Sequence, residues 1–275
     1  MVGRFTRGLR VVDDSVDVFR DNPRLAILPL LSLLSIGGAF AIVLGTALRY
    51  GAVSSVLTSD LLQYAAIFVA IAVSSSVGTF FNAAVVHCAF QYFDGKETSV
   101  RGGLAAAWQV RRKIALWSVT AATLGTVLYI IDENFGALGS LARVLFDLAW
   151  GLLTFFVIPV LVLEDTKGLR PLLQESGTAF RETWGESITA SLGISFVFFP
   201  VGVIGLSVLG WAYLFASGVP ALLIGSAGFI VLVAAMVAAQ VLGMVARTAL
   251  YRYAVADEKV GPCAGRNPET IFPSD

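Results

Sequence analysis

The chain has 275 residues, of which 57% are hydrophobic and only 14% are charged. Soluble domains carry about 25% charged residues, so this composition argues against a soluble fold. The formal net charge is +0, which argues against a nucleic-acid binder that relies on overall charge. Of the two cysteines, Cys88 lies in an apolar run and Cys263 in the C-terminal tail, so we expect no structural disulfide.

Residues 3–21 predict an amphipathic helix. Its apolar residues are spaced 4, 3, 4 and 3 positions apart, and acidic residues lie away from them; the apolar set is Phe5, Leu9, Val12, Val16 and Phe19. We expect this helix to lie in the membrane interface; the alternative is a helix packed on a soluble domain. The polar N-terminus and the long first apolar run favour a chain without a cleavable signal peptide.

The first two predicted membrane spans are 25–48 and 61–93. A helix of 24 residues is about 36 Å long, which is enough to cross a hydrocarbon core of about 30 Å. Gly37, Ala41 and Gly45 form a small-residue seam in the first span, of the kind that permits close helix contact. The second span is long and is therefore expected to be tilted or to project from the bilayer.

A second interfacial helix is predicted over residues 98–112, followed by spans at 114–131 and 141–163. A third interfacial helix covers 168–184. Its predicted apolar face consists of Leu169, Leu172, Leu173, Ser176, Phe180 and Trp184.

The last two spans are predicted at 187–209, interrupted by Pro200, and at 220–253, with a turn over 210–218. Residues 256–275 contain three prolines and few large apolar side chains, which is typical of a disordered cytoplasmic tail. The predicted architecture is therefore an all-α polytopic membrane bundle, with residues 1–255 as its membrane domain.

The loop charges predict the orientation in the membrane. Of the 19 Lys and Arg residues, 17 fall in the segments before span 1, between spans 2 and 3, between spans 4 and 5, and from Arg247 onward. Only Arg49 and Arg143 lie on the other side. Because basic segments stay in the cytoplasm, we expect six spans in the cell membrane with both termini cytoplasmic. Five or seven spans would split the basic segments.

An internal repeat is visible in the lead-in helices. Asp14-Ser15 is followed by Phe19-Arg20-Asp21 at the same spacing as Glu175-Ser176 is followed by Phe180-Arg181-Glu182. Residues 100–113, with Trp108 in place of the phenylalanine, occupy the equivalent place. We therefore interpret the chain as three units, each an interfacial helix and a transmembrane hairpin; the alternative is that amphipathic lead-ins resemble one another.

The segments TFFVIPVLVLED, ESGTAFRETWGE and FNAAVVHCAF resemble those of an archaeal and bacterial family of six-span integral membrane proteins of unknown function. That family is similar to the membrane domain of some bacterial glycerophosphodiester phosphodiesterases. The resemblance implies an integral membrane fold, and it implies no activity, cofactor or site residue. The phosphodiesterase catalytic domain is absent from this chain.

Polar groups inside the predicted spans are functional candidates. Asp147 is the first, and the alternative is an i,i+4 pair with Arg143 at the outer interface. His87 could relay protons, or it could be a neutral histidine bonded to a neighbouring helix. Asn82 and Gln240 are intramembrane amides that could join helices.

Arg111, Arg112 and Lys113 are candidate contacts for anionic lipid headgroups, and they are equally the expected topology signal. No cluster has metal-ligand spacing, and we expect no cofactor and no nucleic-acid partner. Paired catalytic carboxylates or a nucleophile with its base are not recognisable, so we do not expect an enzyme. The sequence favours a protein that organises or binds the lipid bilayer; the alternative is a permease or channel for a small solute or ion.

Overall fold

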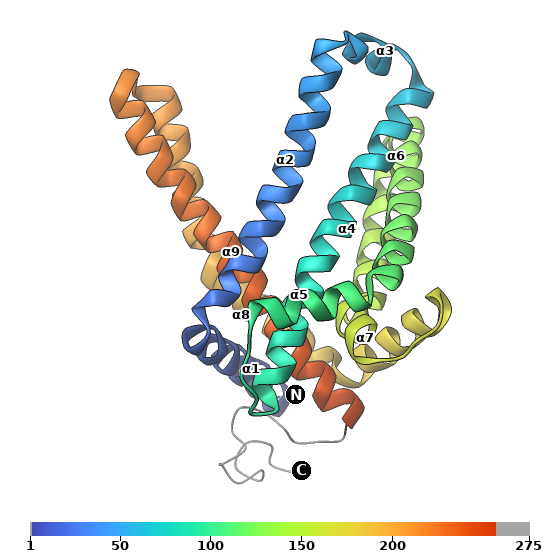
Figure 1. Ribbon diagram of the computed structural model, residues 1–275, viewed down its shortest axis with the longest axis vertical. Coiled ribbons are helices and arrows are strands. Elements are labelled where there is room, and N and C mark those ends of the chain that lie inside the picture. The colour runs from blue at the N-terminus through green and yellow to red at the C-terminus, as the bar shows by residue number, and fades with distance from the viewer. Residues whose placement is uncertain (1, 257–275) are drawn as a thin grey trace. The chain divides into compact units, whose positions relative to one another are not determined.

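The computed structural model describes residues 2–256. The predicted disordered tail, with Cys263, therefore lies outside the described residues apart from Ala256. Every regular element in the described chain is helical, as the predicted all-α class requires (Figure 1). The elements are α1 (Val2–Asp21), the 3-10 turn η1 (Pro23–Ala26), α2 (Ile27–Arg49), α3 (Ala52–Thr58), α4 (Asp60–Phe93), α5 (Val100–Gln109), α6 (Arg111–Leu153), α7 (Val157–Leu163), α8 (Leu169–Phe215) and α9 (Gly218–Ala256).

The chain forms two compact units. Unit 1 is drawn from Met1–Ala26, Ala89–Glu97 and Glu182–Asp275, and unit 2 from Ile27–Cys88 and Thr98–Arg181. Helices α4 and α8 each contribute residues to both units.

Helix α6, in unit 2, folds back on itself at Gly136. The φ of 52° and ψ of −134° at this residue are non-helical, and a glycine adopts a positive φ without the cost of a Cβ. A Cβ on Gly139 would collide with the carbonyl oxygen of Ile131. Trp117 and Trp150 stack with ring centroids 5.8 Å apart, whereas a straight helix would separate them by about 50 Å. Helix α6 is therefore an antiparallel hairpin (Figure 1).

The helical conformation is interrupted between α6 and α7, inside the predicted span 141–163. Pro159 has no N–H, and its ring would clash with the carbonyl four residues earlier in a continuous helix, so it lies in the first turn of the new helix α7. Ser176 of α8 satisfies the backbone at this break. Its Oγ donates to the carbonyl oxygen of Leu153 at 2.7 Å and accepts from the amide of Phe156 at 3.1 Å.

Helix α8 contains both the predicted interfacial helix 168–184 and the predicted span 187–209. The non-helical residue within it is Thr183, with φ −115° and ψ 19°. The helix continues through Pro200, so the interruption predicted there was wrong. The predicted turn 210–218 was too long, because α8 extends to Phe215 and α9 begins at Gly218.

Unit 1 packs α1 against α8 and α9. A core of Ile194, Leu242 and Ala246 is covered by apolar side chains of α1, which are Val11, Val12, Val16 and Phe19. Helices α8 and α9 approach closely at two glycines: a Cβ on Gly205 would lie 3.0 Å from the carbonyl oxygen of Gly228. Such glycine contacts are typical of helices that pack in a membrane.

Unit 2 packs α5 against α4 in the same manner. A Cβ on Gly103 would lie 2.7 Å from the carbonyl oxygen of Ala84 and 2.8 Å from Sγ of Cys88, so only glycine permits this approach. Ser99 caps α5 by accepting from the amide of Gly102 at 3.0 Å. The other face of α4 packs on α6, where Gln63 donates to the hydroxyl of Tyr129 at 3.1 Å.

Candidate functional site

Four polar residues gather at the turn of α6. The guanidinium of Arg143 lies 2.9 Å from a carboxylate oxygen of Asp132 and 3.7 Å from one of Asp147. The hydroxyl of Ser140 donates to Asp132. The Asp147 side chain is 57% exposed and that of Arg143 42% exposed. The closer partner of Arg143 is therefore Asp132, and Asp147 lies at the edge of the cluster.

The predicted pair Arg143–Asp147 is present, but the sequence did not indicate that Asp132 joins it. That contact requires the chain to reverse at Gly136. The acidic pair at the end of the first apolar stretch of α6, followed by two glycines and an arginine, was the available signal.

We define the basic corner as Arg111, Arg112 and Lys113. Its two arginines and its lysine lie in different environments. Arg111 donates to the carbonyl oxygen of Trp108 at 3.0 Å, and its guanidinium lies 5.1 Å from the centroid of that indole ring. Trp108 is 61% exposed, and both arginines are exposed. An exposed indole with a guanidinium on its face suits a membrane–water interface.

Lys113 makes a different set of contacts. Its ammonium donates to the backbone carbonyl oxygen of Glu164 at 2.7 Å and lies 3.9 Å from a carboxylate oxygen of Asp165. It thus joins the start of α6 to the segment between α7 and α8. The predicted lipid-binding triad therefore separates into two exposed arginines and one lysine that holds the fold together.

The predicted intramembrane amides and the histidine are divided between the two units. Asn82 and His87 are half-buried on α4 in unit 2, and Gln240 is half-buried on α9 in unit 1. Asn82 and His87 are five positions apart, or about 140° around the helix, so they lie on different faces. Within residues 2–256 no group of three or more His, Cys, Asp or Glu side chains could hold a metal ion.

Arg252 of unit 1 is a residue whose role the sequence did not indicate. It is only 8% exposed. Its guanidinium lies 2.8 Å from a carboxylate oxygen of Asp94 and 4.7 Å from the ring centroid of Phe90. The nearby Tyr92 donates to Asp21 at the end of α1. These contacts fasten α1, the end of α4 and the end of α9 together.

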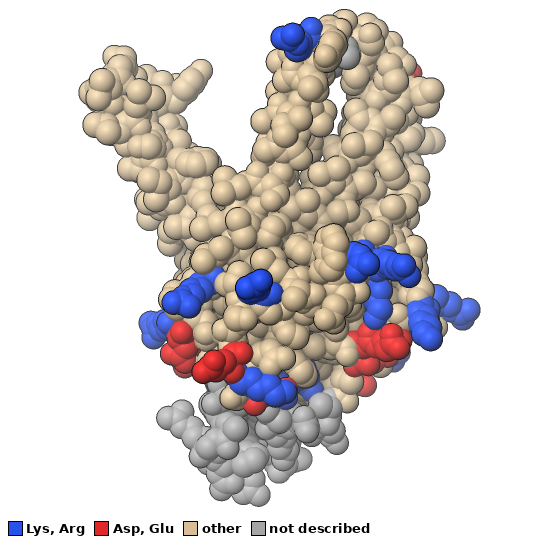
Figure 2. All heavy atoms as spheres, viewed as in Figure 1, with Lys and Arg blue, Asp and Glu red and all other residues tan. Residues whose placement is uncertain are grey.

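The long helices carry large apolar side chains on their outer surfaces. Examples that are more than 70% exposed are Leu138, Phe196, Phe199 and Leu222. Buried positions on the same helices are often small or polar, such as Ser118 and Ser187. On the face of unit 2 that Figure 2 shows, few charged side chains lie along the middle of α2, α4 and α6, and charged side chains gather around α5 and α7. This distribution is compatible with a lipid environment.

Five helices among the described residues are long and apolar enough to cross a membrane. They cover Pro23–Arg49, Asp60–Phe93, Arg111–Leu163, Leu169–Phe215 and Gly218–Val255. The third of these ranges contains the α6 hairpin, and so contains both predicted spans 114–131 and 141–163. The chain is therefore compatible with a multi-pass membrane protein.

Comparison with known proteins gave one family. Residues 61–262 match the family of unknown function DUF6159. No curated protein matched the chain, and no solved structure did. The comparisons lend no support to the similarity with the membrane domain of glycerophosphodiester phosphodiesterases. Because the match covers α4 to α9 and more than two thirds of the sequence, the chain belongs to the family of unknown function DUF6159.

Proposed function

We propose that this chain is a non-enzymatic integral protein of the cell membrane that crosses the bilayer six times and binds and organises its lipids. The observation that carries the proposal is the exposed apolar surface of the long helices, together with the charged side chains of unit 2 around α5 and α7 (Figure 2). In water such a surface would far exceed the apolar patches that monomeric soluble proteins expose.

The α6 hairpin supports the proposed number of crossings. Residues 111–135 make about 37 Å of helix, and residues 137–163, which include α7, make a return path of similar length. Each path is long enough for a hydrocarbon core of about 30 Å. With α6 and α7 counted as two crossings, the five long ranges give six, and both termini lie on the side of the basic segments.

The burial pattern supports a threefold repeat. Alignment of the three lead-in helices on Phe19, Trp108 and Phe180 brings the residues just before them into register. Those residues, Val18, Ala107 and Ala179, are all buried. Ser15 and Ser176 occupy equivalent positions in the first and third helices, and both are buried as well. If the three helices resembled one another only because they are amphipathic, they would not need to bury side chains at the same aligned positions.

Arg111 and Arg112 are the proposed contacts for anionic headgroups of the cytoplasmic leaflet. Both guanidinium groups are exposed, and Arg111 stacks on an indole suited to the headgroup level. A basic residue near an anionic surface contributes about 1 kcal/mol. Two such residues would therefore favour anionic lipid by roughly tenfold or more.

The test is a lipid-preference measurement on the full chain in mild detergent. Native mass spectrometry would compare retention of phosphatidylglycerol and phosphatidylcholine. We expect the parent to retain more phosphatidylglycerol, and the variant Arg111→Gln/Arg112→Gln to lose that preference. Lys113→Gln is the matched control, because it should lower thermal stability while leaving the lipid preference in place. A parent without preference for either lipid would contradict the proposal.

The polar cluster at the α6 turn fits a structural role. Asp147 makes one long, exposed contact, and such i,i+4 pairs contribute about 0.2–0.5 kcal/mol. We therefore expect Asp147→Asn to change the melting temperature in detergent very little. Asp132→Asn should cost more, since Asp132 accepts from both Ser140 and Arg143. A larger loss in Asp147→Asn than in Asp132→Asn would instead favour a permease that uses the Asp147 carboxylate.

A further inference from the structure

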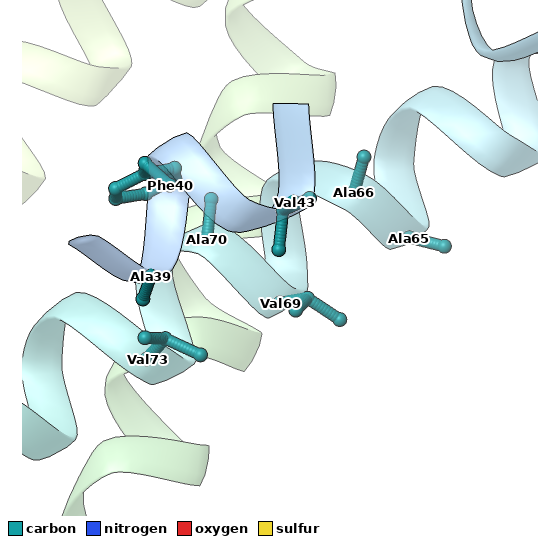
Figure 3. A pocket seen from close by; sticks show the side chains of 8 residues that line it. All are labelled: Ala39, Phe40, Val43, Ala65, Ala66, Val69, Ala70 and Val73. Carbon is teal, nitrogen blue, oxygen red and sulfur yellow. The ribbon is translucent and has the colours of Figure 1, made fainter. Parts of the chain in front are cut away.

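An apolar groove lies between α2 and α4 in unit 2. It has a volume of about 300 Å³ and is lined by Ala39, Phe40 and Val43 of α2 and by Ala65, Ala66, Val69, Ala70 and Val73 of α4 (Figure 3). The ribbons of these helices stand apart along this stretch (Figure 1), and the space-filling view shows an opening between them near α3 (Figure 2). The groove is therefore open to the surroundings of the protein.

The lining selects a hydrocarbon occupant. All eight side chains consist of carbon and hydrogen only, so none can donate to or accept from a ligand. A polar occupant would lose its hydrogen bonds to water without replacement. The opposite face of α4 is already filled, since a Cβ on Gly125 of α6 would lie 3.0 Å from Ile71. The groove thus has a firm wall on α4 and open access between the helices.

The depth of the groove matches one leaflet. Val43 and Ala39 lie six and ten residues before Arg49, or about 9 and 15 Å along α2. Ala65 and Val73 lie five and thirteen residues after Asp60, or about 8 and 20 Å along α4. Half of a hydrocarbon core of about 30 Å is about 15 Å. The groove therefore extends from just below the helix ends to the middle of a bilayer.

The charges at these helix ends complement a zwitterionic headgroup. Between Leu25 and Phe93, Arg49 and Asp60 are the only Lys, Arg, Asp or Glu residues in the sequence. Arg49 is the last residue of α2 and Asp60 the first of α4, and both are exposed. The guanidinium can pair with a phosphate and the carboxylate with an ammonium group.

We propose that the α2–α4 groove binds one acyl chain of a zwitterionic glycerophospholipid in the leaflet opposite the basic corner, with its headgroup between Arg49 and Asp60. This site rests on the proposed function, because it requires α2 and α4 to cross the bilayer. It differs from the Arg111–Arg112 contact in leaflet, in headgroup charge and in its dependence on a shaped apolar surface.

The test uses the full chain in nanodiscs that contain a phosphatidylcholine with a photoreactive diazirine in its acyl chain. After irradiation, peptide mass spectrometry maps the adducts. We expect adducts on the α2–α4 lining several-fold above those on the exposed apolar surface of α8. Ala70→Phe should fill the groove and lower this yield several-fold, whereas Ala41→Phe, on the same unit but outside the lining, should leave it unchanged.

A charge-removing double variant and a membrane-extraction assay distinguish failure of the groove from failure of the membrane assignment. Arg49→Gln/Asp60→Asn leaves the packing intact and should lower the adduct yield even if Ala70→Phe does not fold. Adducts spread evenly over all exposed helices, or an equal yield in Ala70→Phe and Ala41→Phe, would overturn the site. Loss of adducts in both, with a change from dimer to monomer, would assign the groove to a second copy of the chain. Release of the parent from membranes by alkaline carbonate would instead overturn the membrane assignment itself.

Discussion

Helix α1 and the start of α8 carry the same sequence pattern, and side chains at the same positions of that pattern are buried in both. Ser15 is 1% exposed and Ser176 0%, and three positions later Val18 and Ala179 are also buried. The predicted apolar stripe of α8 included the buried Ser176 but not Ala179, and that of α1 included neither Ser15 nor Val18. Phe19 and Phe180, one in each stripe, are only half-buried. The aligned buried positions of the two helices therefore include small side chains that apolar spacing alone does not select.

The two serines occupy equivalent positions but make different hydrogen bonds. The Ser15 hydroxyl donates to the carbonyl oxygen of Val11 in its own helix, at 2.6 Å. The Ser176 hydroxyl joins two backbone groups of another segment, across the break between α6 and α7. The two helices thus bury the same aligned positions, and the segment packed on that face decides what the serine contributes.

The largest expected effect is that of Ser176→Ala. It leaves the carbonyl oxygen of Leu153 and the amide of Phe156 without their side-chain partner, and each buried unpaired group costs about 1–3 kcal/mol. We expect a clear drop of the melting temperature in detergent. If Ser176→Ala and Ser15→Ala lowered it equally, the distinction between the two helices would be wrong.

Overpacking of the next buried position should have a smaller effect. Ala179→Leu adds three carbons where the side chain is 2% exposed, and such insertions cost about 1–3 kcal/mol. Val18→Leu adds a single carbon at the equivalent position of α1 and is the matched control. Thermal unfolding of both variants checks the order; a greater loss in Val18→Leu would show that α1 has the tighter contact.

Tyr92→Phe tests a contact that only α1 has. Its Asp21 accepts from Tyr92, whereas the equivalent Glu182 of α8 is exposed. Loss of one hydrogen bond costs about 0.5–1.5 kcal/mol. In Tyr92→Phe we expect faster amide hydrogen exchange over the last turn of α1 and unchanged exchange over residues 169–182. Unchanged exchange over α1 would mean that the bond does not hold its end.

The smallest effect is expected for Ser15→Ala. The lost hydrogen bond lies within the helix, and alanine is the better helix former. The melting temperature should change by the equivalent of about 0.5 kcal/mol or less. A drop as large as that of Tyr92→Phe would indicate that Ser15 also serves another segment.

The sequence predicted the helical class and most helix ranges because long apolar runs and amphipathic spacing are local properties. It predicted the buried face of α8 only in part and missed that of α1, since apolar spacing does not distinguish contact with protein from contact with lipid. The break before α7 was not predicted, and Ser176, which bonds the backbone at this break, lies 17 residues beyond Pro159.

The same limit applies to the candidate sites. Arg143 and Asp147 are four residues apart and were paired from spacing alone. Asp132 and Arg143 meet only because Gly136 reverses the chain. The role of Arg252 could not be read from its neighbours in the sequence, because its ion-pair partner Asp94 comes 158 positions earlier.

The central claim is that α6 crosses the membrane twice, within a six-span chain whose basic segments are cytoplasmic. It is tested most directly by single cysteines in a chain that carries Cys88→Ala and Cys263→Ala. Leu138→Cys at the α6 turn should react with an impermeant maleimide in intact cells, and Glu97→Cys between α4 and α5 should react only after the membrane is opened. Labelling of Glu97→Cys in intact cells, with Leu138→Cys protected, would contradict the account.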